Sequence, residues 1–190
     1  MNAMNILIVG VGGQGTLLAS KLMGKIFIDS GLDVKVSEVH GMSQRGGSVV
    51  TYVRAGEKVF SPVIDLGEAD VMISFEALES ARWLPYLKKG GTVISNTAQI
   101  DPMPVIMGNA EYPQDILGQI RAANVNVISA DALALAEQAG SAKAVNIVLL
   151  GMAAKALELC YDDCIAAIRA TVPQKTIEIN EKAFELGYNL

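Results

Sequence analysis

The side chains of this sequence that are best suited to binding chemistry lie in two glycine-rich segments. The first segment consists of Gly10, Gly12, Gly13, Gln14 and Gly15. The second segment contains Glu38, His40, Ser43, Gln44, Arg45, Gly46 and Gly47. Glycines let a backbone turn tightly and approach a ligand, while carboxylate, imidazole, amide and guanidinium groups supply hydrogen bonds and charge. The two segments therefore predict one crevice that binds a polar or anionic ligand.

The first segment by itself admits three interpretations. Its Gly-x-Gly-x-x-Gly pattern between a strand and a helix is typical of dinucleotide binding, with Glu38 bonding the ribose of a nicotinamide or flavin nucleotide. A second interpretation is a helix N-terminus that binds another anion, such as the pyrophosphate of coenzyme A. In the third, the glycines only allow close packing of a strand, a helix and a neighbouring subunit. These residues leave all three interpretations open.

Two side chains of the second segment could take part in acid–base catalysis or in binding an anion. His40 is the only histidine of the chain, so any acid–base chemistry that needs histidine must use it. No serine or cysteine nucleophile can be paired with it from the sequence, so we assign no catalytic residue and expect a structural hydrogen bond. Arg45 suits a bidentate contact with a phosphate or a carboxylate, on a ligand or across an interface.

The cysteines do not predict a metal centre in this chain. Iron–sulfur clusters and structural zinc usually need four Cys or His ligands, and the chain offers Cys160, Cys164 and one histidine. We expect both cysteines to be small buried residues in a predicted helix, with no metal and no cofactor held by this chain alone.

Length and composition predict one domain over residues 1–190. Hydrophobic residues make up 51% of the chain and aromatic residues only 5%, so the core is expected to be aliphatic. The net charge of -5 and the absence of a Lys/Arg cluster argue against nucleic-acid binding. Neither a signal peptide nor a membrane span is predicted, so we expect a cytoplasmic location. Met4 also suits a natural start, with Met1 to Ala3 as a cloning remnant.

The elements that must position both segments predict an α/β, Rossmann-like, doubly wound, mostly parallel sheet with a helical C-terminal segment. Strands are expected over residues 6–9 and 34–39, joined by a helix from Gly13 to form the first βαβ unit. Five apolar residues of that helix are expected to face the sheet: Leu17, Leu18, Leu22, Ile26 and Phe27.

Later strands and helices are predicted from the same patterns. Residues 48–54 and 59–61 predict a hairpin, and residues 69–75, 92–95 and 124–129 predict strands. Helices are expected over residues 76–87, 115–123 and 131–139, with Glu76 and Glu79 capping the first and residues 88–91 ending it. Asn96 and Thr97 then end a strand at the crevice. Residues 105–107, flanked by prolines, are expected as an edge strand or extended arm outside the main sheet.

The C-terminal part predicts helices of two kinds. Residues 145–157 form a helix that is apolar nearly all round, which a monomer of this size is expected to bury only in part, so a partner chain is predicted to cover it. Asn146 in this helix is expected to fix packing rather than bind a ligand. Residues 174–186 predict a more amphipathic helix.

The chain resembles the gamma-type subunits of the 2-oxoacid:ferredoxin oxidoreductases over nearly its whole length. The resemblance is carried, in order, by GVGGQG (10–15), EVHGMSQRGG (38–47), Ser61-Pro62, Gly67 to Asp70, Asn96-Thr97 and NIVLLG (146–151). The second motif is the specific one, because pyruvate-type relatives tend to have a Tyr-Gly-Pro version of it. Its His-Gly-Met-Ser-Gln form indicates the indolepyruvate or arylpyruvate branch.

The resemblance implies a subunit, inactive alone, of an enzyme that decarboxylates a 2-oxoacid oxidatively to an acyl-CoA and reduces ferredoxin. It implies that thiamine diphosphate and the Fe-S clusters belong to a larger partner chain, with coenzyme A as co-substrate. This domain is then expected to contact its partner and help enclose substrate or coenzyme A. A homodimer stays open, as do a self-sufficient NAD(P)- or flavin-dependent oxidoreductase and a scaffolding subunit without a ligand.

Overall fold

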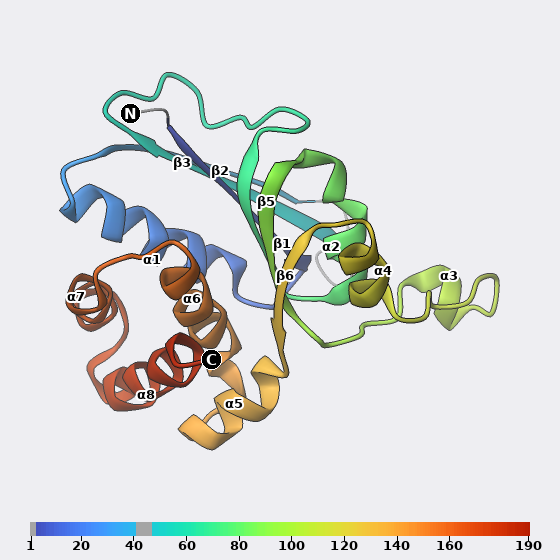
Figure 1. The fold of residues 1–190 in the computed structure, drawn as a ribbon. Helices are drawn as coiled ribbons and strands as arrows, with labels where there is room; N and C mark the ends of the chain where they lie inside the picture. Colours follow the sequence, from blue (N-terminus) through green and yellow to red (C-terminus); the bar gives the residue numbers. More distant parts are fainter. Residues whose placement is uncertain (1–2, 41–46) are drawn as a thin grey trace.

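The computed structural model describes residues 3–40 and 47–190, whose strands form one sheet with helices on both faces (Figure 1). The strands are β1 (Met4–Val11), β2 (Asp33–His40), β3 (Ser48–Gly56), β4 (Ala69–Ser74), β5 (Leu87–Asn96) and β6 (Asn126–Ala130). The α-helices are α1 (Thr16–Asp29), α2 (Ala77–Arg82), α3 (Met103–Ile106), α4 (Ile116–Ala122), α5 (Ala132–Ala139), α6 (Val145–Ala156), α7 (Tyr161–Thr171) and α8 (Ile177–Tyr188). Short 3-10 helices are η1 (Leu84–Tyr86), η2 (Ala142–Ala144) and η3 (Gln174–Thr176).

The sheet is mostly parallel, as predicted, but its first unit is built differently. The strand order is β2-β3-β1-β4-β5-β6, in which β3 runs antiparallel to both neighbours and β1, β4, β5 and β6 pair in parallel. The expectation that β2 lies beside β1 is therefore wrong, because β3 lies between them. With strands about 4.8 Å apart, β2 lies about 10 Å from β1.

Alternating side chains of the central strand β1 divide the interior into two cores. Ile6 and Ile8 belong to the core shared with α1, α6 and α8, whereas Leu7 and Val9 belong to the core shared with α2 and α4. All four side chains are fully buried. The sheet is thus covered on both faces, as a parallel strand of uninterrupted apolar residues requires.

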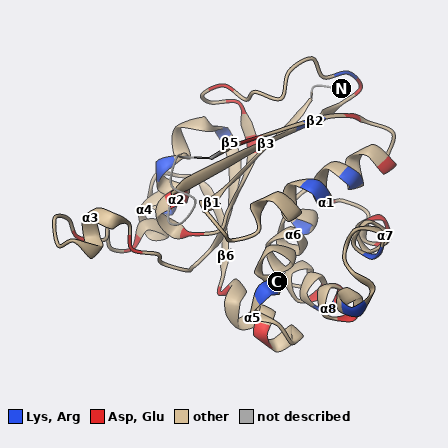
Figure 2. Ribbon diagram, turned by 180° about the vertical axis from the view of Figure 1, so that it is seen from behind, with Lys and Arg blue, Asp and Glu red and all other residues tan. Residues whose placement is uncertain are grey.

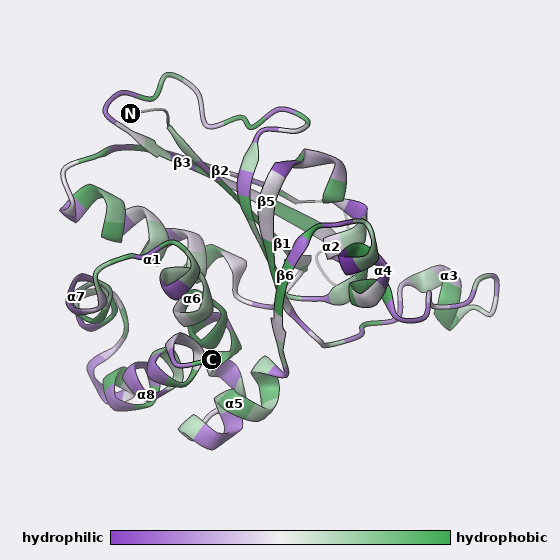
Figure 3. Ribbon diagram, in the orientation of Figure 1, coloured by the Kyte–Doolittle hydropathy of each residue, from purple (hydrophilic) through white to green (hydrophobic). Residues whose placement is uncertain are grey.

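Helix α6 is buried within this chain, so the expectation that a partner covers its apolar surface is wrong. Every residue from Asn146 to Ala154 is buried, and α1, α5 and α8 surround α6 on its side of the sheet (Figure 3). The close approach of α8 depends on two glycines. A Cβ on Gly151 would lie 2.2 Å from the carbonyl oxygen of Phe184, and one on Gly187 would lie 2.1 Å from that of Val148.

Two local expectations are wrong, and a third is confirmed only in part. Helix α2 ends at Arg82, ahead of Pro85 in η1, and residues 88–91 belong to β5 instead of ending a helix. Residues 59–61 form no strand, since β3 pairs with β2 and β1. Residues 105–107 lie outside the sheet as predicted, but they end helix α3 instead of forming a strand.

No helix among the described residues is long and apolar enough to cross a membrane.

Candidate functional site

The side chain of Gln14 joins the carboxyl ends of β1 and β4, where the crevice was predicted. Its Oε1 accepts the backbone N–H of Val11 at 2.7 Å, and its Nε2 donates to the carbonyl of Phe75 at 3.2 Å. A Cβ on Gly10 would lie 2.8 Å from this Oε1 and 3.0 Å from the Cβ of Phe75. Gly10 therefore makes room for Gln14, which ties the two strand ends together.

The other glycines of the first segment shape a turn before α1. Gly13 and Gly15 have φ angles of 98° and 90°, in the left-handed region, so α1 begins at Thr16 and the expected start at Gly13 is wrong. Asn146 donates from Nδ2 to the carbonyl of Gly15 at 3.4 Å, which confirms its packing role. Leu17 is 62% exposed and does not face the sheet as expected.

The two glycine-rich segments meet at one backbone hydrogen bond. Gly12 donates its N–H to the carbonyl of Gly47 at 3.0 Å, which brings the end of the second segment against the first. Four predicted residues, Ser43, Gln44, Arg45 and Gly46, lie outside the described residues. His40 ends β2, and its side chain also lies outside the part that the structure describes.

Glu38 is held away from the glycine strand. Its Oε2 accepts the Thr51 hydroxyl at 3.0 Å, and Thr51 of β3 in turn pairs with Ile8 of β1. In dinucleotide-binding folds the ribose-binding acid follows the strand next to the glycine strand. Here β3 occupies that place, so the geometry disfavours Glu38 as a ribose ligand and with it the nicotinamide interpretation.

A network at the start of β3 was missed in the sequence. Glu79, only 4% exposed, accepts the Ser48 hydroxyl and pairs with Arg82 Nε at 3.1 Å. Trp83 Nε1 donates to the same Ser48 oxygen at 3.2 Å. Because Ser48 directly follows Gly47, helix α2 fixes the chain beside the glycine segments. Glu79 and Trp83, one helical turn apart after a central strand, were the signal for this network.

The carboxylate of Glu76 caps α2, as predicted, and also binds two distant points of the chain. It is 1% exposed and accepts the backbone N–H of Glu79 at 2.9 Å and of Ile100 at 3.1 Å. The Tyr112 hydroxyl donates to it as well. Burial and this carboxylate raise the pKa of Tyr112 well above its usual value, so the hydroxyl keeps the proton that it donates.

Asn96, at the end of β5, lies beside Gln14 at the strand ends where the crevice was predicted. Its Nδ2 donates to the Phe75 carbonyl at 3.3 Å, an oxygen that it shares with Gln14, and its Oδ1 accepts from Ala132 at 3.1 Å. Thr97 lines a small neighbouring cavity of about 190 Å³ beside Tyr112 and Asp115. The polar groups at these strand ends are thus used mainly to hold the elements in place.

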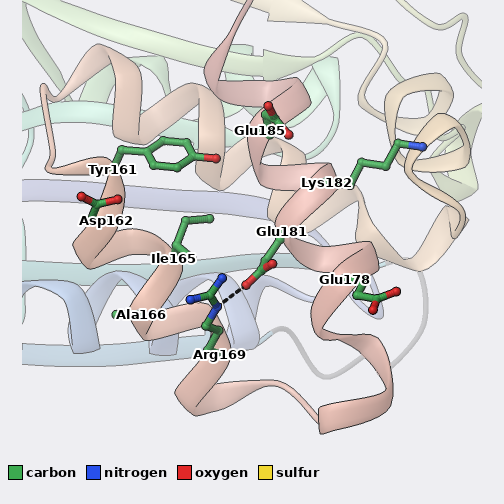
Figure 4. A pocket seen from close by; sticks show the side chains of 9 residues that line it. All are labelled: Tyr161, Asp162, Ile165, Ala166, Arg169, Glu178, Glu181, Lys182 and Glu185. Carbon is green, nitrogen blue, oxygen red and sulfur yellow. Dashed lines mark hydrogen bonds and ion pairs between the residues drawn. The ribbon is translucent and has the colours of Figure 1, made fainter.

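A larger groove, of about 610 Å³, lies between α7 and α8 (Figure 4), and its lining includes no residue of the glycine-rich segments. It is lined mainly by charged side chains, and Arg169 pairs with Glu181 inside it. This pairing raises the pKa of Arg169 above its usual value. Lys182, the other basic side chain of the lining, points away from this pair (Figure 4), and the groove offers no feature that links it to the predicted crevice.

The donor set of this chain does not fit an iron–sulfur cluster. Cys160 is exposed, contrary to expectation, and Cys164 is buried. Burial raises the pKa of the Cys164 thiol to about 12, so it stays protonated and is a poor metal ligand near neutral pH. Among the residues that the structure describes, no three His, Cys, Asp or Glu side chains gather as a metal site would require.

Comparison with known proteins identifies the protein family, which the geometry of the site alone does not. The sequence model of the family described as pyruvate ferredoxin/flavodoxin oxidoreductase matches residues 5–190. The indolepyruvate oxidoreductase subunit IorB of Thermococcus kodakarensis is 44% identical over 192 residues, which cover 98% of this chain and 95% of the relative.

Solved structures have the same fold. The keto/oxoacid ferredoxin oxidoreductase gamma subunit of Geobacter sulfurreducens has a TM-score of 0.74 at 21% identity and covers 98% of this chain and 96% of its own. A 2-oxoglutarate:ferredoxin oxidoreductase of Magnetococcus marinus, with 2-oxoglutarate, coenzyme A and succinyl-CoA bound, has a TM-score of 0.73 at 17% identity. That match covers 100% of this chain and 31% of the larger one.

Proposed function

The chain belongs to the pyruvate ferredoxin/flavodoxin oxidoreductase family, and on this basis we propose that it is the small subunit of an arylpyruvate:ferredoxin oxidoreductase. Indolepyruvate is the 2-oxoacid that we expect it to serve, through oxidative decarboxylation to the acyl-CoA. The observation that carries this proposal is the 44% identity with an indolepyruvate oxidoreductase subunit over 98% of the chain.

The division of labour follows from the donor sets. A subunit with two cysteines, one of them buried and protonated, cannot bind the clusters that pass electrons to ferredoxin. We therefore assign the Fe-S clusters to a larger partner chain. The family resemblance implies that thiamine diphosphate belongs to the same partner, in what we propose is a cytoplasmic, oxygen-sensitive complex. Thiamine diphosphate supplies the carbanion chemistry when bound there, and this chain contributes contacts rather than the reacting groups.

The two glycine-rich segments are the part of this chain that we propose faces the partner or coenzyme A. Support comes from the Gly12–Gly47 hydrogen bond, which joins the segments at the carboxyl ends of the strands, where doubly wound sheets bind ligands. The site consists of Gly10, Gly12, Gly13, Gln14, Gly15, Glu38, His40, Ser43, Gln44, Arg45, Gly46 and Gly47. Within this site, Gly10 and Gln14 hold the ends of β1 and β4 together. The charged residues of the second segment contact the partner or coenzyme A.

The substrate class is tested by ranking 2-oxoacids on the co-expressed complex under anaerobic conditions. We expect coenzyme A-dependent viologen reduction with indolepyruvate and phenylpyruvate, at a kcat/KM at least about tenfold above that for pyruvate or 2-oxoglutarate, because a pocket shaped for an aromatic ring gains its apolar burial. A complex that prefers pyruvate would contradict the arylpyruvate assignment and leave the family assignment intact.

A further inference from the structure

A short arm, residues 100–112, projects from the body of the molecule beside α2 and α4 (Figure 1). Helix α3 and its C-cap residue expose three large apolar side chains, Met103, Ile106 and Met107, at 61%, 65% and 64%. They stand at positions i, i+3 and i+4, so they share one face of the helix. Val105, off this face, packs against the core beneath. The arm thus turns an apolar face outward.

The arm is held at both ends by a single buried carboxylate. Glu76 accepts the backbone N–H of Ile100 and the hydroxyl of Tyr112, the first and last residues of the arm. Within the arm, Asn109 donates its N–H to the carbonyl of Pro104 at 2.8 Å, closing the turn after α3. An apolar face presented in this fixed way loses little conformational entropy on binding.

The charge of the arm itself indicates what kind of surface covers it. No Lys or Arg occurs between Lys89 and Arg121, whereas Asp101, Glu111 and Asp115 do, and the first two are exposed on the arm. Figure 2 shows the same distribution, with acidic and no basic positions on the α3 segment. A complementary surface is an apolar groove with Lys or Arg side chains along its rim. A second copy of this chain, of net charge -5, is the less complementary partner.

We propose that the α3 arm docks in a basic-rimmed apolar groove of the larger, thiamine-binding partner chain. This inference rests on the proposed function, because that function requires the larger partner chain. Its mode is helix-in-groove recognition, in which anchors at i, i+3 and i+4 enter one groove. The two methionines suit such a contact because their flexible, polarizable side chains adapt to the facing surface.

The test is co-expression of the partner chain with variants of this chain, followed by affinity measurement on the purified subunits. The double variant Met103→Asp with Ile106→Asp is expected to bind about 30-fold more weakly or worse, since central apolar anchors are the usual hot spots of an interface. Glu111→Lys, which changes charge outside the helix, is expected to weaken binding and to reduce its dependence on salt. The control is Ile28→Asp, a 59% exposed residue of α1, which should bind normally.

Two outcomes separate this inference from the proposed function. If the wild-type chain binds the partner and both arm variants bind equally well, the arm inference is overturned and the subunit assignment stands. If the wild-type chain does not bind the partner at all, the subunit assignment fails together with the inference. An arm-dependent dimer of this chain alone, seen as a doubled mass that the double variant abolishes, would also overturn the inference.

Discussion

Replacing Gly187 with alanine is expected to lower the free energy of unfolding by about 2–3 kcal/mol. A Cβ at this position would lie 2.1 Å from the carbonyl oxygen of Val148 and 2.9 Å from its carbonyl carbon. These are backbone atoms of the buried helix α6, so neither can turn aside as a flexible side chain would. Helix α8 must instead move away from α6, and packing in the largest core is lost.

Gly24→Ala is the matched control for this variant. Gly24 is also a buried helical glycine, in α1, but a Cβ there would meet only the Val36 and Val34 side chains, at 3.7 and 3.8 Å. We expect it to stabilise the chain by about 0.5–1 kcal/mol, because alanine restricts the unfolded chain more than glycine does. Urea denaturation compares the two. Equal midpoints would contradict the close packing of α8 on α6.

Glu76→Ala is expected to have the largest effect among the polar residues, a loss of about 3 kcal/mol or more. The substitution leaves the N–H groups of Glu79 and Ile100, together with the Tyr112 hydroxyl, without their acceptor. Each donor left unsatisfied in a buried site costs about 1–3 kcal/mol. The loss is measured from the urea midpoint of the isolated chain.

Tyr112→Phe separates the contribution of the tyrosine hydroxyl from that of the backbone bonds of Glu76. The variant removes one donor to Glu76 and the acceptor of the Leu78 N–H, but leaves Glu76 with its two backbone partners, so we expect a smaller loss of about 1–2 kcal/mol. If Tyr112→Phe cost as much as Glu76→Ala, the backbone bonds of Glu76 would contribute little. The clamp on the arm would then depend on the tyrosine alone.

The class of fold was predictable because β1 and the helices after it carry strong periodic patterns. The four apolar residues from Ile6 to Val9, followed at once by glycines, favour a strand buried on both faces, and all four are fully buried in β1. The place of β3 was not predictable, since its pairing with both β1 and β2 depends on tertiary contacts that no local pattern encodes. The same limit explains the wrong expectation for α6: its apolar surface indicated burial, but not that α1, α5 and α8 of the same chain provide that burial.

The prediction that the two glycine-rich segments lie close together is confirmed, and the structure adds intramolecular partners for several of their side chains. The glycine segments do meet at Gly12 and Gly47. Gln14, however, uses its amide between Val11 and Phe75, and Glu38 bonds Thr51. Side-chain type identifies groups able to bind a ligand, but the backbone donors and acceptors that compete for them are visible only in the folded structure.

The most direct measurement omits one chain at a time from an anaerobic assay with indolepyruvate, coenzyme A, thiamine diphosphate and viologen. We expect reduction only when this chain and the larger partner chain are both present, and no saturable binding of NAD or NADP by this chain alone. Reduction by this chain without its partner, or tight NAD binding that Glu38→Ala abolishes, would contradict the assignment as a subunit without its own redox cofactor.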